Sequence, residues 1–92
     1  EVLVGPASYR EFMAEVAGRH GHGHAAPDAA VVDRFFTVQC FWDEFMAWRL
    51  ASLATDHPDT TLAVLVGRGH LRPGEGIPWR LQRRVPGLEV EV

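Results

Sequence analysis

A histidine follows an apolar run near the middle of the chain. Residues 60–66 read Thr-Thr-Leu-Ala-Val-Leu-Val and lead into Gly67-Arg68-Gly69-His70. A short β-branched run that ends at glycines is typical of a strand buried on both faces, and ligands of open α/β sheets bind beyond the carboxyl ends of such strands. Gly67 and Gly69 are expected to adopt positive φ or to lie close to a ligand. The pattern predicts a site at His70, although a tight turn with a surface histidine fits it too.

Two polar residues interrupt the apolar face of a long predicted helix. This helix is expected over residues 29–55, with Asp28 as its N-cap. On a helical wheel, Gln39 and Asp43 fall one turn apart inside the apolar stripe. The apolar members of that stripe are Val32, Phe36, Met46, Leu50 and Ala54. A buried carboxylate requires a partner, so these two side chains either tie the helix to a neighbour or form one polar wall of a pocket.

Three further histidines alternate with glycine. His20, His22 and His24 lie in a stretch without periodicity, which predicts a loop. Neutral imidazole is a common metal ligand, so the three could gather around one metal ion or a haem iron. Gathering them costs conformational entropy, and exposed histidines without a ligand remain the alternative.

The remaining pattern predicts a small α/β fold. A first helix is expected over residues 9–17, with Ser8 and Glu11 forming a capping box. A short helix should have Pro78 in its first turn and end near Arg84. Strict alternation in residues 88–92 is typical of an edge strand. The expected architecture is a partial open sheet flanked by helices, in the order α-α-β-α-β.

Composition excludes several classes of protein. The chain has 92 residues, a formal net charge of −3 and nine basic residues, all of them arginine. This size allows one domain, and this charge argues against sequence-independent nucleic-acid binding. Cys40 is the only cysteine, which excludes an internal disulfide and predicts a small buried hydrophobe. Because no apolar run approaches about 18–20 residues, no transmembrane segment is predicted.

The apolar surface of the long helix extends beyond the stripe described above. Phe41, Phe45 and Trp48 lie to one side of that stripe and make the helix apolar around most of its circumference. Such a helix is usually sandwiched between other elements, which a chain of 92 residues can hardly provide. We therefore expect the partner to be the missing N-terminal half of a larger domain or a second copy, forming a dimer.

Three sequence blocks in this order resemble the ChaN-like haem-binding uptake proteins, which share a superfamily with the Tiki proteases and the erythromycin esterases. The blocks are Phe36-Thr37-Val38-Gln39-Cys40-Phe41-Trp42-Asp43-Glu44-Phe45-Met46-Ala47, Val64-Leu65-Val66-Gly67-Arg68-Gly69-His70 and Gly74-Glu75-Gly76-Ile77-Pro78-Trp79-Arg80-Leu81. The resemblance covers residues 8–85 and implies a fragment from the C-terminal part of a longer ChaN-like domain. The N-terminal strand of the family, which ends in a Gly-Glu-x-His-like motif, is absent from this sequence.

This resemblance implies an α/β fold in which Gln39, Asp43 and His70 face one cleft, and it implies a role in haem or iron uptake. Haem requires an axial ligand, apolar walls and cations for its propionates. His70 or Tyr9 could supply the ligand. The expected walls and cations are Met46, Trp42, Phe45, Arg68 and Arg80.

More distant relatives imply a metal-dependent hydrolase instead. In that hypothesis His70 binds a divalent ion, and Asp43 or Glu44 acts as acid or base. The chain offers one or two ligands near His70, so we expect no catalysis from this chain alone. A third alternative is an interaction fragment without activity of its own.

Overall fold

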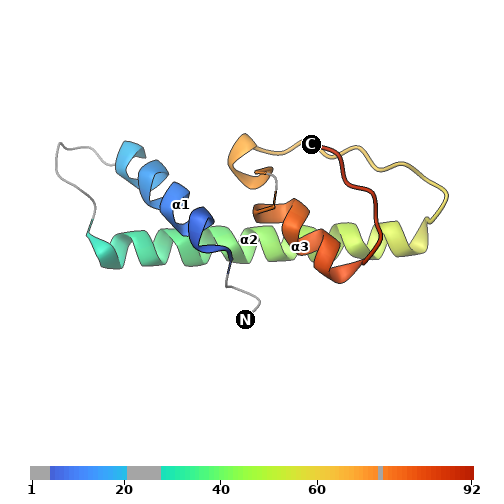
Figure 1. Ribbon diagram of the computed structural model, residues 1–92, viewed down its shortest axis with the longest axis horizontal. Coiled ribbons are helices and arrows are strands. Elements are labelled where there is room, and N and C mark those ends of the chain that lie inside the picture. The colour runs from blue at the N-terminus through green and yellow to red at the C-terminus, as the bar shows by residue number, and fades with distance from the viewer. Residues whose placement is uncertain (1–4, 21–27, 73) are drawn as a thin grey trace. The chain divides into compact units, whose positions relative to one another are not determined.

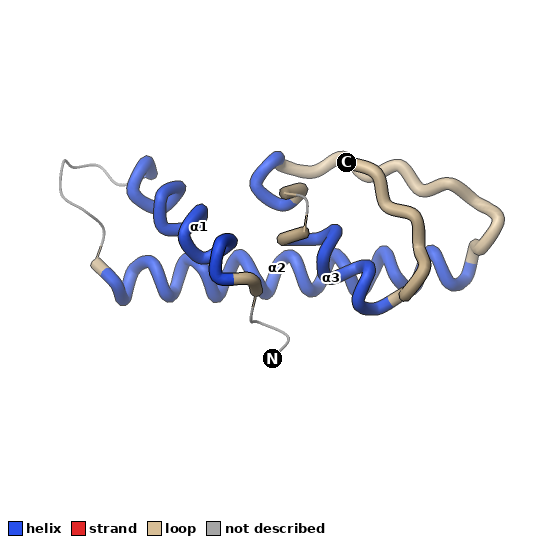
Figure 2. The backbone as a smooth tube through the Cα atoms, viewed as in Figure 1, coloured by secondary structure: helices blue, strands red, loops and turns tan. Residues whose placement is uncertain are grey.

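The described part of the chain is helical. The computed structural model describes residues 5–20, 28–72 and 74–92. Its elements in order are α1 (Ala7–His20), α2 (Ala29–Asp56), the single 3₁₀ turn η1 (Arg68–His70) and α3 (Gly76–Arg84) (Figure 1). Neither expected strand forms in these ranges, and both segments are loop (Figure 2). The prediction of an α/β fold with a partial open sheet in the order α-α-β-α-β is therefore wrong for this structure.

The strand prediction fails for want of a pairing partner. A strand exists only through hydrogen bonds to a neighbouring strand. Residues 61–66 form no backbone hydrogen bond with any other described residue, and Leu65 is 101% exposed. At the other segment, the Leu88 amide donates to the Val85 carbonyl, which closes a turn. High β-propensity favours a pleated, half-buried surface but does not supply one.

Helix α2 has the predicted cap and length. The Oδ1 atom of Asp28 accepts a hydrogen bond from the Ala30 amide at 3.1 Å, which satisfies a free amide of the first turn. The helix runs for 28 residues and ends just before His57, whose conformation is restricted by Pro58. None of the described helices combines the length and apolar character that crossing a membrane requires.

Helix α1 is longer than expected at both ends. The Pro6 carbonyl accepts hydrogen bonds from the amides of Tyr9 and Arg10, so the helix begins before Ser8. Ser8 therefore lies inside the first turn, and the predicted capping box with Glu11 is wrong. The helix also continues beyond the predicted end at residue 17, as far as His20.

The structure divides into two compact units, Glu1–Phe41 and Trp42–Val92, each with its own core. In the first unit, the buried residues Tyr9, Met13 and Cys40 pack together. Partly buried aromatic side chains surround them, namely Phe12, Phe35 and Phe36. The prediction that Cys40 is a buried hydrophobe is confirmed, because its side chain is fully buried within this cluster.

The second unit packs α3 on the C-terminal half of α2. Ala47 of α2 lies against Ile77 and Leu81 of α3 in a buried cluster. Partly buried apolar residues complete this core, namely Met46, Leu50, Ala51, Val66, Leu88 and Val90. Helix α3 ends at the predicted residue and holds Pro78 in its first turn, as expected. It also contacts η1, so this core determines where His70 lies.

Candidate functional site

A buried carboxylate on α2 holds the histidine of η1. Asp43 is 0% exposed, and its Oδ1 atom lies 2.5 Å from Nδ1 of His70. The His70 side chain is 23% exposed, so part of the ring reaches solvent. The prediction that Asp43 is buried with a partner is confirmed, and that partner is the histidine singled out from the sequence.

The contact determines which ring nitrogen of His70 can act as a ligand. A carboxylate is an acceptor, so the hydrogen bond requires the proton on Nδ1. In the neutral ring, Nε2 then carries the lone pair. A carboxylate on the far nitrogen orients metal-binding imidazoles and raises their basicity. The pair can therefore present Nε2 to an iron or to a proton.

The glycine that positions His70 is Gly76, not Gly67 or Gly69. Gly67 has a φ of −58°, and neither Gly67 nor Gly69 has positive φ, so the first of the two alternatives expected for them is wrong, and closeness to a ligand stays a prediction. Gly76 has a φ of 55°, and a Cβ atom there would lie 2.5 Å from the His70 carbonyl oxygen. Helix α3 can begin this close to η1 only because residue 76 lacks a side chain.

A second ionic cluster lies next to Asp43 in sequence. Glu44 accepts a hydrogen bond from Nη1 of Arg80 at 2.8 Å and also pairs with Arg84. The Arg80 side chain is 0% exposed and that of Glu44 is 15% exposed. Burial by itself raises the pKa of Glu44, but the hydrogen bonds and charges of both arginines outweigh it and lower that pKa below its ordinary value. Arg80 is thus held in an ion pair between α3 and α2.

The other expected haem contacts are divided between core and surface. Met46 packs on the core of the second unit. Tyr9 is fully buried in the first unit and meets Phe36 edge-to-face with ring centroids 6.1 Å apart. Both are therefore core residues in this structure. Arg68 is exposed on η1, and Gln39 is half-buried one turn before Asp43 on α2.

The glycine-flanked histidines lie beyond what the structure describes. His20 ends α1, but its side chain, and all of His22 and His24, fall outside the described residues. Among the side chains that are described, no group of three histidine, cysteine, aspartate or glutamate residues could hold a metal ion. Asp43 and His70 therefore make a pair rather than a metal-binding cluster.

Sequence reasoning missed a buried acid in the loop before α3. Glu75 is 6% exposed, and its Oε2 atom lies 2.6 Å from Nε of Arg72. It directly precedes Gly76, which packs on the His70 carbonyl. The signal in the sequence is the glycine on each side of Glu75. Both Gly74 and Gly76 adopt positive φ, so they form a tight turn around this charged residue.

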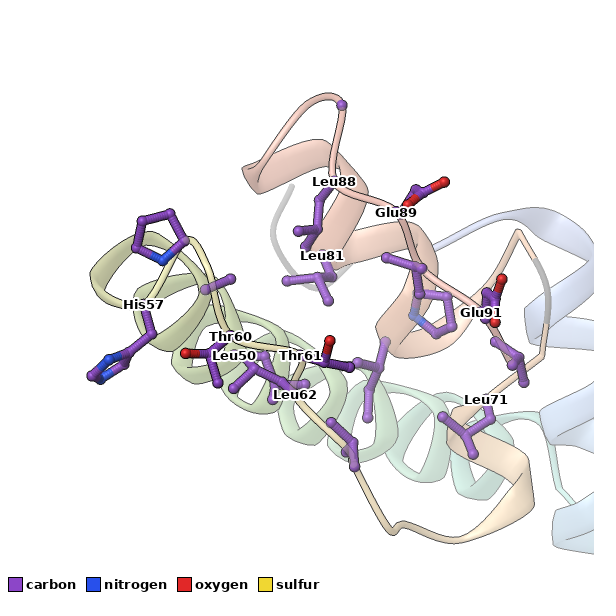
Figure 3. Close-up of a pocket in the computed structure, with 18 residues that line it drawn as sticks. Leu50, His57, Thr60, Thr61, Leu62, Leu71, Leu81, Leu88, Glu89 and Glu91 are labelled. Atoms are coloured by element: carbon purple, nitrogen blue, oxygen red, sulfur yellow. The ribbon is translucent and has the colours of Figure 1, made fainter.

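A separate cavity of about 1100 Å³ lies in the second unit, between α2, α3 and the two extended segments (Figure 3). Its walls combine apolar with polar side chains, and His70 is not among the residues that line it. Glu89 and Glu91 are its carboxylates. The cavity is therefore distinct from the Asp43–His70 pair and differs from it in chemistry.

Comparison with known proteins gives one match. Residues 1–81 match the family model described as "Haem-binding uptake, Tiki superfamily, ChaN". The matched range includes Asp43, His70 and Arg80. No curated protein and no solved structure matches the chain.

Proposed function

Since the chain belongs to the ChaN family of haem-binding uptake proteins in the Tiki superfamily, we propose that it binds haem as cargo and that His70 is the iron ligand. The observation that carries this assignment is the 2.5 Å contact between Asp43 Oδ1 and His70 Nδ1. It fixes the ring and leaves the lone pair on Nε2.

The residues present fit the ligation of haem. Iron in haem can be held by a single axial histidine, whereas a divalent zinc site takes three or four protein ligands. The Asp43–His70 pair offers one oriented imidazole, and the described residues contain no group of three metal-binding side chains. This donor set favours haem over a divalent ion.

A propionate requires a cation near the ligand. Arg68 begins the same 3₁₀ turn as His70 and is exposed, so we assign this role to it. Arg80, considered for the same role from the sequence, is buried in its ion pair with Glu44.

The large cavity is a poor place for haem. Its carboxylates, Glu89 and Glu91, carry the same charge as the propionates and would repel them. Trp42 and Phe45, on either side of Asp43 in sequence, are 51% and 49% exposed and offer aromatic surface for the macrocycle. The opposite face of the haem would be covered by the N-terminal half of the domain or by a second copy.

Haem titration tests this proposal. The wild-type chain should develop a Soret band, and His70→Ala should abolish it. Asp43→Asn should weaken haem affinity about 10- to 100-fold, the usual loss for a partner of a ligating histidine. Arg68→Gln should weaken it less, because it removes only a charge at the surface.

Two control variants separate the site from adventitious capture. His57→Ala changes an exposed histidine beyond the end of α2 and should leave the Soret band unchanged. Changing His20, His22 and His24 together to alanine should also leave it unchanged. A Soret band that disappears in this triple variant but survives His70→Ala would overturn the assignment.

A further inference from the structure

The carboxylate that holds His70 lies where solvent cannot screen its charge. Asp43 is 0% exposed, and Ala47, one turn further along α2, is also 0% exposed. Interactions between charges are stronger at such a buried position than in water, and salt screens them less. The charge of Asp43 therefore acts strongly on any ligand that His70 binds.

The imidazole of His70 carries this effect to its other nitrogen. Nδ1 donates its proton to Oδ1 of Asp43 at 2.5 Å, and a carboxylate in that position makes the ring a more basic ligand. A more basic Nε2 stabilises ferric iron more than ferrous iron, because ferric iron carries the larger positive charge. Hydrogen bonding behind the axial ligand and burial around it are two of the means by which a protein tunes haem iron. The contact thus favours ferric haem at Nε2.

Side chains that could oppose this preference are held in cores or screened by solvent. A methionine ligand would favour ferrous haem. The chain has two methionines, Met13 and Met46, and both pack in hydrophobic cores. The cation of Arg68 lies on the same 3₁₀ turn as His70, but it is exposed, so solvent and salt screen it. The buried carboxylate should therefore outweigh the exposed cation.

We propose that the Asp43–His70 pair makes the site selective for ferric over ferrous haem, and that Asp43 is the residue that determines this selectivity. The proposal rests on the haem binding and on the ligand role of His70 proposed above. It goes further than they do, because an imidazole without a carboxylate behind it can bind either oxidation state. The cargo is thereby narrowed to haem whose iron is oxidised.

Two haem titrations of the full 92-residue chain test this selectivity. One uses ferric haem, and the other uses haem reduced with dithionite in the absence of oxygen. The wild type should bind ferric haem more tightly than ferrous haem by about tenfold, the lower end of the effect that a partner of a ligating histidine has on affinity. Asp43→Asn should weaken the binding of ferric haem much more than that of ferrous haem, so the ratio of the two affinities should fall about tenfold.

Potentiometry measures the same preference independently. A tenfold fall in the ratio of affinities corresponds to about 59 mV for a one-electron couple, so the haem bound to Asp43→Asn should have a midpoint potential more positive by about that amount. Arg68→Gln is the matched control. It removes a propionate contact that does not depend on the oxidation state, so it should weaken the binding of both forms alike.

The outcomes distinguish this proposal from haem binding itself. Equal affinity of the wild type for ferric and ferrous haem would overturn the selectivity and leave haem binding in place. The same conclusion would follow if Asp43→Asn kept its helices by circular dichroism and kept the wild-type ratio of affinities. Absence of a Soret band from the wild type with either form of haem would overturn haem binding and the selectivity with it.

Discussion

Asp43 and Glu44 are neighbours on α2 but belong to different regions of the second unit. Asp43 is fully buried against His70, whose ring is partly exposed. Glu44 is shared by Arg80 and Arg84 of α3, and Arg80 is fully buried. Consecutive helical positions point about 100° apart, so one turn of α2 can serve both η1 and α3.

Asp43 and Glu44 differ in role because one pairs with a histidine and the other with arginines. Guanidinium groups stay charged and bind carboxylates through several donors, which suits a permanent link between helices. An imidazole can be held by one nitrogen and used through the other. The Glu44 cluster therefore stabilises the unit, and the Asp43–His70 pair can act on a ligand. The predictions below test this division.

The largest effect is expected from Arg80→Ala. The change deletes a fully buried side chain and one of the two cations that pair with Glu44, so the loss should approach the value of about 3–5 kcal/mol that is typical when a buried ion pair is broken, although Arg84 still faces Glu44. Urea unfolding followed by circular dichroism should show this loss in the free energy of unfolding. Arg83→Ala is the matched control: Arg83 stacks on Trp79 at 4.5 Å and is exposed, so its loss should cost about 1 kcal/mol or less. If Arg80→Ala instead kept full stability and lost haem binding, the division would be wrong.

Gly76→Ala should damage the fold and His70 together. The new Cβ atom would lie 2.5 Å from the His70 carbonyl oxygen, and φ at this position is 55°. Gly74→Ala is a close control, because Gly74 has a φ of 73° but a Cβ atom there would meet no other atom within 4 Å. The control should lose about 1–2 kcal/mol from left-handed strain alone, and Gly76→Ala should lose more. If both variants lost the same stability in thermal unfolding, the backbone of η1 would be shown to move away from the new Cβ atom without loss of free energy.

The sequence predicted the helices better than the sheet because helices depend on local interactions. The Asp28 cap, the extent of α2 and the end of α3 follow from nearby residues. The position of Asp43 in an apolar stripe also required a partner, whatever that partner was. Strand pairing depends on residues that are far away in the sequence. Residues 61–66 form no backbone hydrogen bond with any such residue in the described part of the chain.

The expectation of positive φ at Gly67 and Gly69 was wrong for a related reason. Spacing placed Gly67 and Gly69 next to His70, but the tight contact is made by Gly76, which approaches through tertiary packing of α3 on η1. The ion pair of Arg80 was also not foreseen. From the sequence, Arg80 is considered only as a cation for a propionate, and its burial against Glu44 depends on the tertiary packing of α3 on α2.

Asp43→Ala should cost about 1–3 kcal/mol of unfolding free energy, because it leaves a part-buried ring nitrogen without its carboxylate. Chemical denaturation measures this loss. Asp43→Asn keeps the volume and should cost less, while still lowering haem affinity. A normal haem affinity in both variants would show that Asp43 serves only stability.

Acid should weaken the Glu44 cluster in a defined direction. The pKa of Glu44 is lower in the folded chain than its ordinary value of 4.5. The ionised form therefore contributes stability that is fully present above that ordinary value and is lost as pH falls through the folded pKa. Glu44→Gln should be less stable than wild type near neutral pH, and the two curves of unfolding free energy should converge as pH falls below about 4.5. A constant difference between them across this range would contradict the ion pair.

The smallest effect on stability is expected at the exposed aromatic surface of α2, whose side chains take no part in either carboxylate contact. Phe41, Phe45 and Trp48 are 55%, 49% and 51% exposed, so no described part of this chain covers them, and the expected covering partner stays a prediction. Trp48→Ser removes one ring, which lies 5.8 Å from that of Phe45, and should cost about 1 kcal/mol or less. The same surface should nevertheless have a large effect on self-association, because exposed apolar patches of this kind mark sites of protein contact. Light scattering over a concentration series should show self-association of the wild type, weakened by Trp48→Ser and unchanged by Arg49→Ser on the same turn. A wild-type chain that stays monomeric at every concentration would leave this surface without a second copy, and of the two proposed covers of the haem only the N-terminal half of the domain would remain.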